Sequence, residues 1–108
     1  MDAISYEDFK KLHMCIVQPI KVEPIPGKSK ILRLTVDIGF GEIRTMIAGG
    51  ADMYKPEIFL ERKFVALINL TPRIIAGIES QGMLLAVDVD GKPIWLEAED
   101  APIGSRIT

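Results

Sequence analysis

The segment from Asn69 to Met83 carries the side chains of this chain that are best suited to chemistry. It contains an amide, a guanidinium, a hydroxyl and a thioether, at Asn69, Arg73, Ser80 and Met83. These groups bind rather than react: a guanidinium pairs with phosphate or carboxylate, amides and hydroxyls form hydrogen bonds, and a thioether packs against apolar groups. The connection from Thr71 to Gly82 is also longer than the about 4–6 residues of an ordinary strand connection, which predicts a binding loop held by a rigid scaffold.

Each of these residues also has a structural interpretation. Asn69 follows an apolar strand and equally suits a capping role, because buried amides must find partners. Met83 begins a strand and also suits core packing, since methionine fills irregular gaps. The glycines are expected to serve backbone conformation, and the isoleucines to pack beneath the loop or in a subunit contact; these residues are Gly77, Gly82, Ile74, Ile75 and Ile78.

A second set of cations precedes this segment. Lys28 and Lys30 lie in a stretch with proline and glycine, and Arg33 and Arg44 lie in the two strands that follow. The formal net charge is −2, yet residues 10–73 hold eleven Lys or Arg against six Asp or Glu, a balance of +5. Local patches set the electrostatic footprint of a binding protein more than the total charge does. This distribution suits a surface that binds polyanions, and it equally suits an ordinary solvated surface.

Catalytic chemistry finds little support in the sequence. His13 and Cys15 stand two residues apart, so their side chains would share one face of a strand, but a cysteine in an apolar run is usually part of the core. Gly39-Phe40-Gly41 lacks the Gly-Lys pair and the helix of a phosphate-binding loop. The acidic run at 97–100 indicates a solvated face rather than a metal site. We therefore expect no catalytic site, no metal site and no cofactor.

Length and composition bound the class of protein. At 108 residues the chain fits one domain, residues 1–108, that folds without disulfides or metal ions. No apolar run reaches the about 18–20 residues of a membrane span, and the acidic N-terminus lacks the features of a signal peptide. A single cysteine excludes an internal disulfide and fits a reducing compartment. A cytoplasmic protein without a membrane partner is expected.

The hydrophobic pattern predicts the elements that must position these side chains. A helical turn over 6–12 has Ser5 as its N-cap. The strand over 13–23 contains Pro19, which predicts an edge position or a bulge. Residues 24–30 are expected to form a loop. Residues 31–38 and 42–48 alternate apolar and polar side chains, which predicts a hairpin that turns at 39–41.

The second half of the chain continues the barrel pattern. A short helix is expected over 54–60, with Pro56 near its first position. Strands over 63–70 and 83–88 flank the long loop, and a turn at 89–93 leads into 94–96 and an extended tail. Five short strands with a helix between the third and fourth, plus extra C-terminal strand material, predict an all-β OB-fold, a partly open five-stranded barrel. An SH3-like barrel is the alternative, but it leaves the helix unexplained.

Four motifs, in this order and spacing, resemble the tRNA-binding domain of the EMAP-II type. They are Thr45-Met46-Ile47-Ala48-Gly49, Tyr54-Lys55-Pro56-Glu57, Asn69-Leu70-Thr71-Pro72-Arg73 and Gly77-Ile78-Glu79-Ser80-Gln81-Gly82-Met83-Leu84-Leu85-Ala86. This domain occurs at the C-terminus or as a separate β subunit of methionyl-tRNA synthetase, and in free-standing tRNA-binding proteins. The resemblance covers nearly the whole chain and implies a homodimeric OB-fold that binds tRNA without reading much sequence.

The resemblance also implies site residues. By matching position, tRNA contacts are expected at Lys30, Asn69, Arg73, Ser80 and Met83, and Arg44 matches an arginine of the motif. Together with Lys28 and Arg33 they form the expected tRNA-binding set. The chain departs from the family pattern at 13–17 and 25–31, and at Ala48, where the family usually has serine. These departures weaken the expected contribution of the first loop, although Lys28 adds a charge.

Three functions follow from these observations. The leading hypothesis is a non-catalytic tRNA-binding protein, a stand-alone β-type subunit that assists the catalytic subunit of methionyl-tRNA synthetase by raising the local tRNA concentration. A CsaA-like export chaperone would share the fold and size, but such chaperones usually lack the Ser-x-Gly-Met element. A docking module that contacts the synthetase and no RNA is the third hypothesis.

Overall fold

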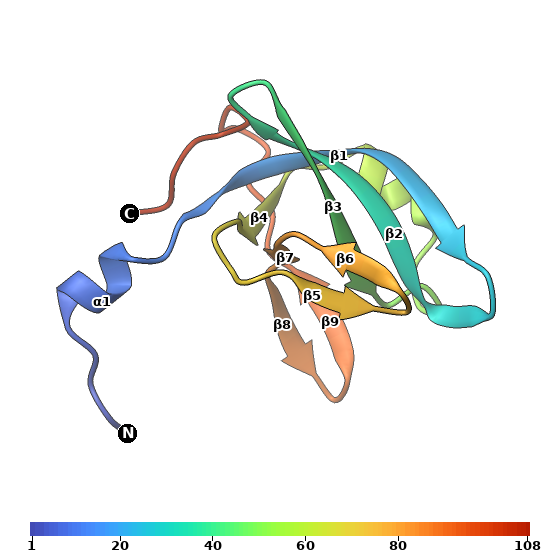
Figure 1. The fold of residues 1–108 in the computed structure, drawn as a ribbon, viewed down its shortest axis with the longest axis horizontal. Coiled ribbons are helices and arrows are strands. Elements are labelled where there is room, and N and C mark those ends of the chain that lie inside the picture. Colours follow the sequence, from blue (N-terminus) through green and yellow to red (C-terminus); the bar gives the residue numbers. More distant parts are fainter.

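The computed structural model describes residues 1–108 and shows an all-β protein built around one curved sheet (Figure 1). Five antiparallel strands follow one another in the order β3-β2-β1-β4-β7. They are β1 (Met14–Ile25), β2 (Lys28–Gly39), β3 (Glu42–Gly49), β4 (Phe64–Leu67) and β7 (Met83–Leu84). This strand order, with a helix between β3 and β4, confirms the predicted OB-fold barrel.

The core of the barrel is organised by the inward-facing side chains of β2. Leu32, Leu34, Val36 and Ile38 are buried, whereas Arg33 between them is exposed. The alternation in the sequence is therefore that of a strand with one face toward the barrel core and the other toward solvent. Neighbouring strands complete the core with Cys15, Val17, Met46, Ala48, Phe64, Ala66 and Leu84.

Strand β1 pairs with two different strands because it bends. Its first residues, from Met14 to Val17, pair with β4, and its remainder from Gln18 onward pairs with β2. The register shifts between Pro19 and Lys21, which confirms the bulge predicted at Pro19. A proline has no N–H for the ladder and is accommodated where the ladder is interrupted.

Two short helices lie where the sequence predicts them. Helix α1 (Tyr6–Lys10) begins after Ser5, whose Oγ accepts the Asp8 N–H at 3.1 Å, as expected of an N-cap. The 3-10 helix η1 (Pro56–Leu60) lies between β3 and β4 and begins at the predicted proline. It places Phe59 in the core, where the ring centroid lies 5.6 Å from that of Phe64 and 5.6 Å from that of Trp95. Neither helix has the length and apolar character that crossing a membrane requires.

The loop expected at 24–30 is largely strand. Strand β1 continues to Ile25 and β2 begins at Lys28, so only the turn at Pro26 and Gly27 remains. Gly27 has a φ of 77°, which glycine adopts at little cost. Pro24 is tolerated because a second register shift follows it. Lys28 and Lys30 are therefore strand residues rather than loop residues.

The loop expected at 71–82 is also wrong in part, because it contains a second small sheet. Strands β5 (Arg73–Ile75) and β6 (Ile78–Ser80) pair as an antiparallel hairpin. The two turn residues, Ala76 and Gly77, have φ values of 52° and 77°, as in the turns that suit two-residue hairpins. Alanine is not a residue that signals such a turn, so the pattern of the sequence gives no sign of it.

The chain after β7 forms a further hairpin and then returns to the barrel. Strands β8 (Ala86–Val89) and β9 (Lys92–Trp95) pair across a turn at Asp90 and Gly91, as the extra C-terminal strand material predicts. The tail then runs along β1, where the Ile16 N–H donates to the Ser105 carbonyl and the Ile107 N–H to the Met14 carbonyl, both at 2.9 Å. The two chain ends consequently lie on the same side of the barrel (Figure 1).

Candidate nucleic-acid interface

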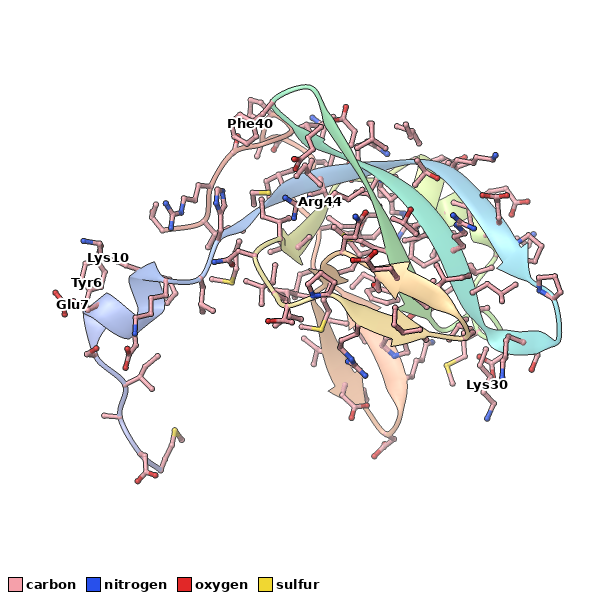
Figure 2. All side chains as sticks on the ribbon, viewed as in Figure 1. Tyr6, Glu7, Lys10, Lys30, Phe40 and Arg44 are labelled. Atoms are coloured by element: carbon pink, nitrogen blue, oxygen red, sulfur yellow. The ribbon has the colours of Figure 1, made fainter.

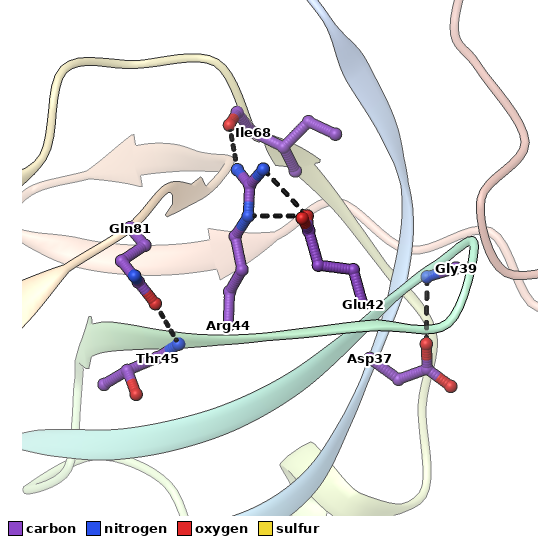
Figure 3. Close-up of polar contacts among 7 residues, drawn as sticks. All are labelled: Asp37, Gly39, Glu42, Arg44, Thr45, Ile68 and Gln81. Atoms are coloured by element: carbon purple, nitrogen blue, oxygen red, sulfur yellow. Dashed lines mark hydrogen bonds and ion pairs between the residues drawn. The ribbon is translucent and has the colours of Figure 1, made fainter.

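The segment Ser80-Gln81-Gly82 closes the barrel against β3, the edge strand of the sheet. The Gln81 N–H donates to the Thr45 carbonyl at 2.8 Å, and the Thr45 N–H donates to Gln81 Oε1 at 3.0 Å (Figure 3). Further along β3, the Ile47 N–H donates to Ser80 Oγ at 3.1 Å, and the Ser80 hydroxyl donates to the Gly82 carbonyl at 3.1 Å. Two side chains therefore supply hydrogen bonds that a full partner strand would otherwise supply.

Gly82 is the residue that permits this close approach. Its φ is 145°, and a Cβ at this position would lie 2.7 Å from Met46 Cε and 3.0 Å from the Leu67 carbonyl oxygen. A larger residue would push the segment away from both β3 and β4. The expectation that Gly82 serves the backbone is confirmed.

Three of the expected site residues meet at one hollow of about 140 Å³, which we call the Arg73 hollow. Arg73 and Met83 are exposed at its border, whereas Ser80 is buried within it. The Arg73 guanidinium is in no ion pair within the protein. A free cation and a thioether beside an apolar floor suit a phosphate with its attached sugar or base; the floor is formed by Ile47, Leu70 and Ile75.

The opposite face of the β5–β6 hairpin borders a wider hollow of about 330 Å³, the Arg33 hollow. Glu79 and Gln81 line it, whereas Ser80 between them lines the Arg73 hollow, as expected for alternate residues of an extended chain. Arg33, Thr45, Gly77 and Ile78 complete its lining. Arg33, like Arg73, is in no ion pair.

A continuous chain of pairings connects the two arginines. Arg33 lies opposite Ile47, the Ile47 N–H binds Ser80, and Ser80 lies opposite Arg73. The middle step of this chain is a hydrogen bond to the Ser80 hydroxyl rather than a backbone ladder. The two arginines are thereby linked through β3, while their side chains line hollows on opposite faces of the β5–β6 hairpin.

Lys28 and Lys30 lie apart from the two hollows. Both are exposed, and they border a separate open hollow of about 260 Å³ at the turn between β1 and β2. The Ala51 N–H donates to the Lys30 carbonyl at 3.1 Å, which fixes this end of β2 against the chain that leaves β3. Lys30 projects from the barrel at the end remote from α1 and Phe40 (Figure 2).

Arg44 is engaged within the protein. Its Nε and Nη2 lie 2.9 and 2.8 Å from Glu42 Oε2, and Nη1 donates to the Ile68 carbonyl (Figure 3). The side chain is only 26% exposed. These contacts join β3 to the end of β4 and use three of the five N–H donors of the guanidinium.

Asn69 fills a capping role. Its Oδ1 accepts the His13 N–H at 2.8 Å, and its Nδ2 donates to the Lys11 carbonyl at 2.6 Å. The side chain thereby fastens the connection between α1 and β1 to the end of β4. One acceptor site and one donor of the amide are thereby used, so the cap fixes the orientation of the side chain.

The environment of Cys15 is that of a core residue. The side chain is fully buried, and this burial raises the pKa of the thiol, while the charge of Arg44 acts in the opposite direction. A raised pKa lowers the fraction of thiolate, whereas a reactive cysteine needs that fraction increased.

The acidic run near the C-terminus fastens the chain to the start of β4. Glu97 lies 3.3 Å from Arg62, and Glu99 Oε1 accepts the Lys63 N–H at 2.8 Å. All three acids of the run are exposed, as expected of a solvated face. Neither in this run nor in the rest of the protein do three side chains of His, Cys, Asp or Glu gather closely enough to hold a metal ion.

Sequence reasoning missed the role of Gln81. Its signal was an amide between Ser80 and a glycine, next to a predicted strand. Its partner Thr45 lies 36 residues earlier, and only the register of the closed barrel brings the two together.

Comparison with known proteins shows the family of this chain. Residues 14–106 match the family described as "Putative tRNA binding domain". Over 105 residues, or 96% of this chain, the sequence is 43% identical to a methionine–tRNA ligase of Methanothrix thermoacetophila. The chain spans only 15% of the length of that curated relative.

Two solved structures resemble the whole fold. A MetRS-related protein from Pyrococcus horikoshii superposes with a TM-score of 0.92 at 34% identity, with both chains fully covered. The chaperone CsaA of Bacillus anthracis superposes with a TM-score of 0.86 at 27% identity, covering 99% of this chain and 100% of that one.

Proposed function

The chain belongs to the tRNA-binding domain family, and from this premise we propose that it is a non-catalytic protein that binds tRNA by its folded shape. We further propose that residues 1–108 act as one domain, as a stand-alone β-type subunit that assists methionyl-tRNA synthetase. The likeness to a MetRS-related protein supports the link to this synthetase.

The observation that carries the proposal is the pair of unpaired guanidinium groups that flank the β5–β6 hairpin, one in each hollow. Lys11, Lys21, Arg44 and Arg62 form ion pairs with carboxylates, whereas Arg33 and Arg73 do not. An arginine that is free of an internal partner can neutralise phosphate without first giving up a contact. Backbone contacts of this kind give affinity without sequence preference, which suits a protein that recognises tRNA by shape.

The expected site residues divide into two groups. In the proposal, Arg73, Arg33, Lys28 and Lys30 contact phosphate, and Met83 packs against a sugar or base. The second group positions the binding surface through hydrogen bonds inside the protein. Ser80 holds the barrel edge, Asn69 the chain after α1, and Arg44 the end of β4. Their place in direct contact with tRNA stays a prediction.

In the proposed mechanism the protein raises the tRNA concentration near a catalytic synthetase subunit. A weak second site on the same assembly increases overall affinity through effective concentration, without any new catalytic group. The relationship to methionine–tRNA ligases, of which this chain matches a small part, supports that choice of partner. The free cysteine fits action in the cytoplasm.

We also propose that the protein acts as a homodimer. Apolar side chains are exposed on one face of the β8–β9 hairpin, where Val87 lies opposite Ile94, and others are exposed on and next to α1. Exposed apolar residues gathered on protruding elements are typical of subunit contacts. Those of the hairpin are Val87, Val89 and Ile94, followed in the chain by Leu96, and those near α1 are Ile4, Tyr6 and Leu12.

A peptide-binding chaperone is the second candidate. The likeness to the chaperone CsaA and the same exposed apolar residues favour it. This candidate predicts that the protein suppresses aggregation of unfolded clients and that tRNA does not interfere. A docking module would instead bind a synthetase in a complex that survives ribonuclease.

A titration against bulk tRNA and against an unstructured RNA of equal length, at several salt concentrations, tests the proposal. Preference for tRNA, with affinity falling linearly on a log–log salt plot, is the expected result. If the protein binds no tRNA near physiological salt, the proposal is overturned and a chaperone or docking function is favoured.

A further inference from the structure

The Arg33 hollow differs in chemistry from the Arg73 hollow. Five of its six lining residues are polar or glycine, and Ile78 is the exception. Its volume of about 330 Å³ lies at the lower end of the about 300–1,000 Å³ typical of small-ligand sites. A polar hollow of this size beside a proposed phosphate-binding surface suits a nucleobase that has left its stack.

Gln81 brings a fixed donor to this hollow. Its Oε1 is occupied by the Thr45 N–H at 3.0 Å, and its own backbone N–H is occupied by the Thr45 carbonyl at 2.8 Å. The remaining polar group of the side chain is Nε2, which donates two hydrogen bonds and never accepts. The orientation of this donor is therefore set by the barrel closure before any ligand arrives.

Glu79 brings a free acceptor. It lies opposite Ile74 in the β5–β6 hairpin and has no ion pair, although Arg33 lines the same hollow. The carboxylate nearest to Arg33 in the sheet register is Glu23, whose ion pair is with Lys21 at 3.7 Å. A carboxylate repels phosphate, so its presence on this surface favours a ligand group that donates hydrogen bonds.

From these groups we infer that the Arg33 hollow binds an unpaired guanine of the RNA. Among the four bases, only guanine presents two adjacent N–H donors on its Watson–Crick edge, at N1 and N2, and a carboxylate accepts such a pair with both oxygens. Gln81 Nε2 donates to O6 of the same edge, and Arg33 stacks on the ring or pairs with the adjoining phosphate. The guanine must be unpaired, because base pairing would use this edge.

This inference rests on the proposed RNA binding and adds base preference to it. Its test uses fluorescence anisotropy with three uridine heptamers, whose central nucleotide is guanosine, inosine or uridine. Inosine lacks only the 2-amino group of guanosine, so it removes one of the two donors to Glu79. We expect the guanosine heptamer to bind about tenfold more tightly than the other two.

Two conservative variants assign the preference to named atoms. Glu79→Gln keeps the shape of the side chain and removes the second acceptor, so the preference for guanosine over inosine should fall below about twofold. Gln81→Glu keeps an acceptor for the Thr45 N–H, removes the donor and adds a negative charge, so affinity should fall for both heptamers and should fall more for the guanosine heptamer than for the uridine heptamer, which reports the charge alone. Circular dichroism and thermal unfolding verify that both variants remain folded.

The outcomes separate the inference from the proposed function. If the protein binds tRNA but binds the three heptamers with equal affinity, the guanine site alone is overturned. A preference for guanosine over inosine that persists in Glu79→Gln has the same consequence. Failure to bind tRNA and all three heptamers overturns both. An accompanying titration with guanosine 5′-monophosphate, followed by ¹H–¹⁵N NMR, should shift the side-chain amide of Gln81, and shifts confined to other residues would place the guanine elsewhere.

Discussion

Gln81 pairs with Thr45 through both its backbone and its side chain, so that one residue replaces a stretch of partner strand. The backbone N–H of Gln81 binds the Thr45 carbonyl at 2.8 Å, and the side-chain Oε1 binds the Thr45 N–H at 3.0 Å. The barrel therefore closes through a side chain at the point where the β5–β6 hairpin ends and the chain enters β7. The stability of the barrel and the position of both hollows depend on the same residue.

Replacing Gln81 with alanine should destabilise the fold. The Thr45 N–H would lose its partner, and leaving such a donor unsatisfied costs about 1–3 kcal/mol. Urea unfolding measures the loss. The matched control is Gln81→Glu, which retains an acceptor and should lose less; equal stability of the wild type and the alanine variant would contradict the closing role.

Replacing Arg73 with alanine should weaken tRNA binding and make it less salt-dependent. Loss of one phosphate contact lowers the log–log slope by about 0.7–0.9. Filter binding at four or more salt concentrations gives the slope. Arg62→Ala is the matched control, because Arg62 is paired with Glu97 at 3.3 Å; a slope that drops equally in both variants would remove Arg73 from the interface.

The barrel could be predicted because its signals are local. Leu32 to Ile38 alternates between apolar and polar residues, Ser5 caps a helix within its own turn, and Pro56 marks the start of η1. Each signal depends on residues a few positions apart, where backbone geometry alone decides the outcome.

The roles of the site residues could not be predicted in the same way, because their partners are remote. Ser80 finds Ile47 at a separation of 33 residues, and Asn69 finds His13 at a separation of 56. From the sequence, each polar side chain is equally suited to an external ligand. The β5–β6 hairpin escaped notice because Ala76 occupies a left-handed position, with a φ of 52°, that is usually held by Gly, Asn or Asp.

Replacing Arg44 with glutamine should affect stability more than salt dependence. The variant loses the hydrogen bonds to Glu42 and to the Ile68 carbonyl, and we expect the free energy of unfolding to fall by about 1–3 kcal/mol. The slope of tRNA affinity against salt should stay at the wild-type value. An unchanged stability together with a slope reduced as in Arg73→Ala would identify Arg44 as a direct phosphate contact.

Cys15 should make the protein less stable as the pH rises above about 9. Burial raises the pKa of this thiol in the folded protein, with Arg44 acting in the opposite direction. Above the ordinary thiol pKa the unfolded chain loses the proton while the folded chain retains it, so the unfolded state binds fewer protons and stability falls with pH. The contribution of the protonated Cys15 thiol to the free energy of unfolding is fully present below the ordinary thiol pKa. It is lost as the pH rises through the pKa of the folded state.

Comparing urea unfolding of the wild type and Cys15→Ala at pH 8 and pH 10 checks this prediction. The alanine variant should be less stable at pH 8, because it leaves a small cavity, but should lose less stability between the two pH values. Parallel pH dependence in the two proteins would show that other groups cause the alkaline loss.

Replacing Gly82 with alanine should damage both the fold and the tRNA site, whereas the same change at Gly77 should damage neither severely. Both glycines have positive φ, at 145° and 77°, so both variants carry backbone strain. Only at position 82 would the new Cβ meet buried atoms, at 2.7 Å from Met46 Cε and 3.0 Å from the Leu67 carbonyl oxygen, while Gly77 has open space around it.

We expect the free energy of unfolding, measured with urea, to fall by about 2–5 kcal/mol for Gly82→Ala and by about 1–2 kcal/mol for Gly77→Ala. Because Gly82 lines the Arg73 hollow and Gly77 only the more open Arg33 hollow, tRNA affinity under folded conditions should fall more in Gly82→Ala than in Gly77→Ala. Equal losses in the two variants would mean that strain alone, and not the close packing of β3, β4 and the closing segment, fixes the hollow.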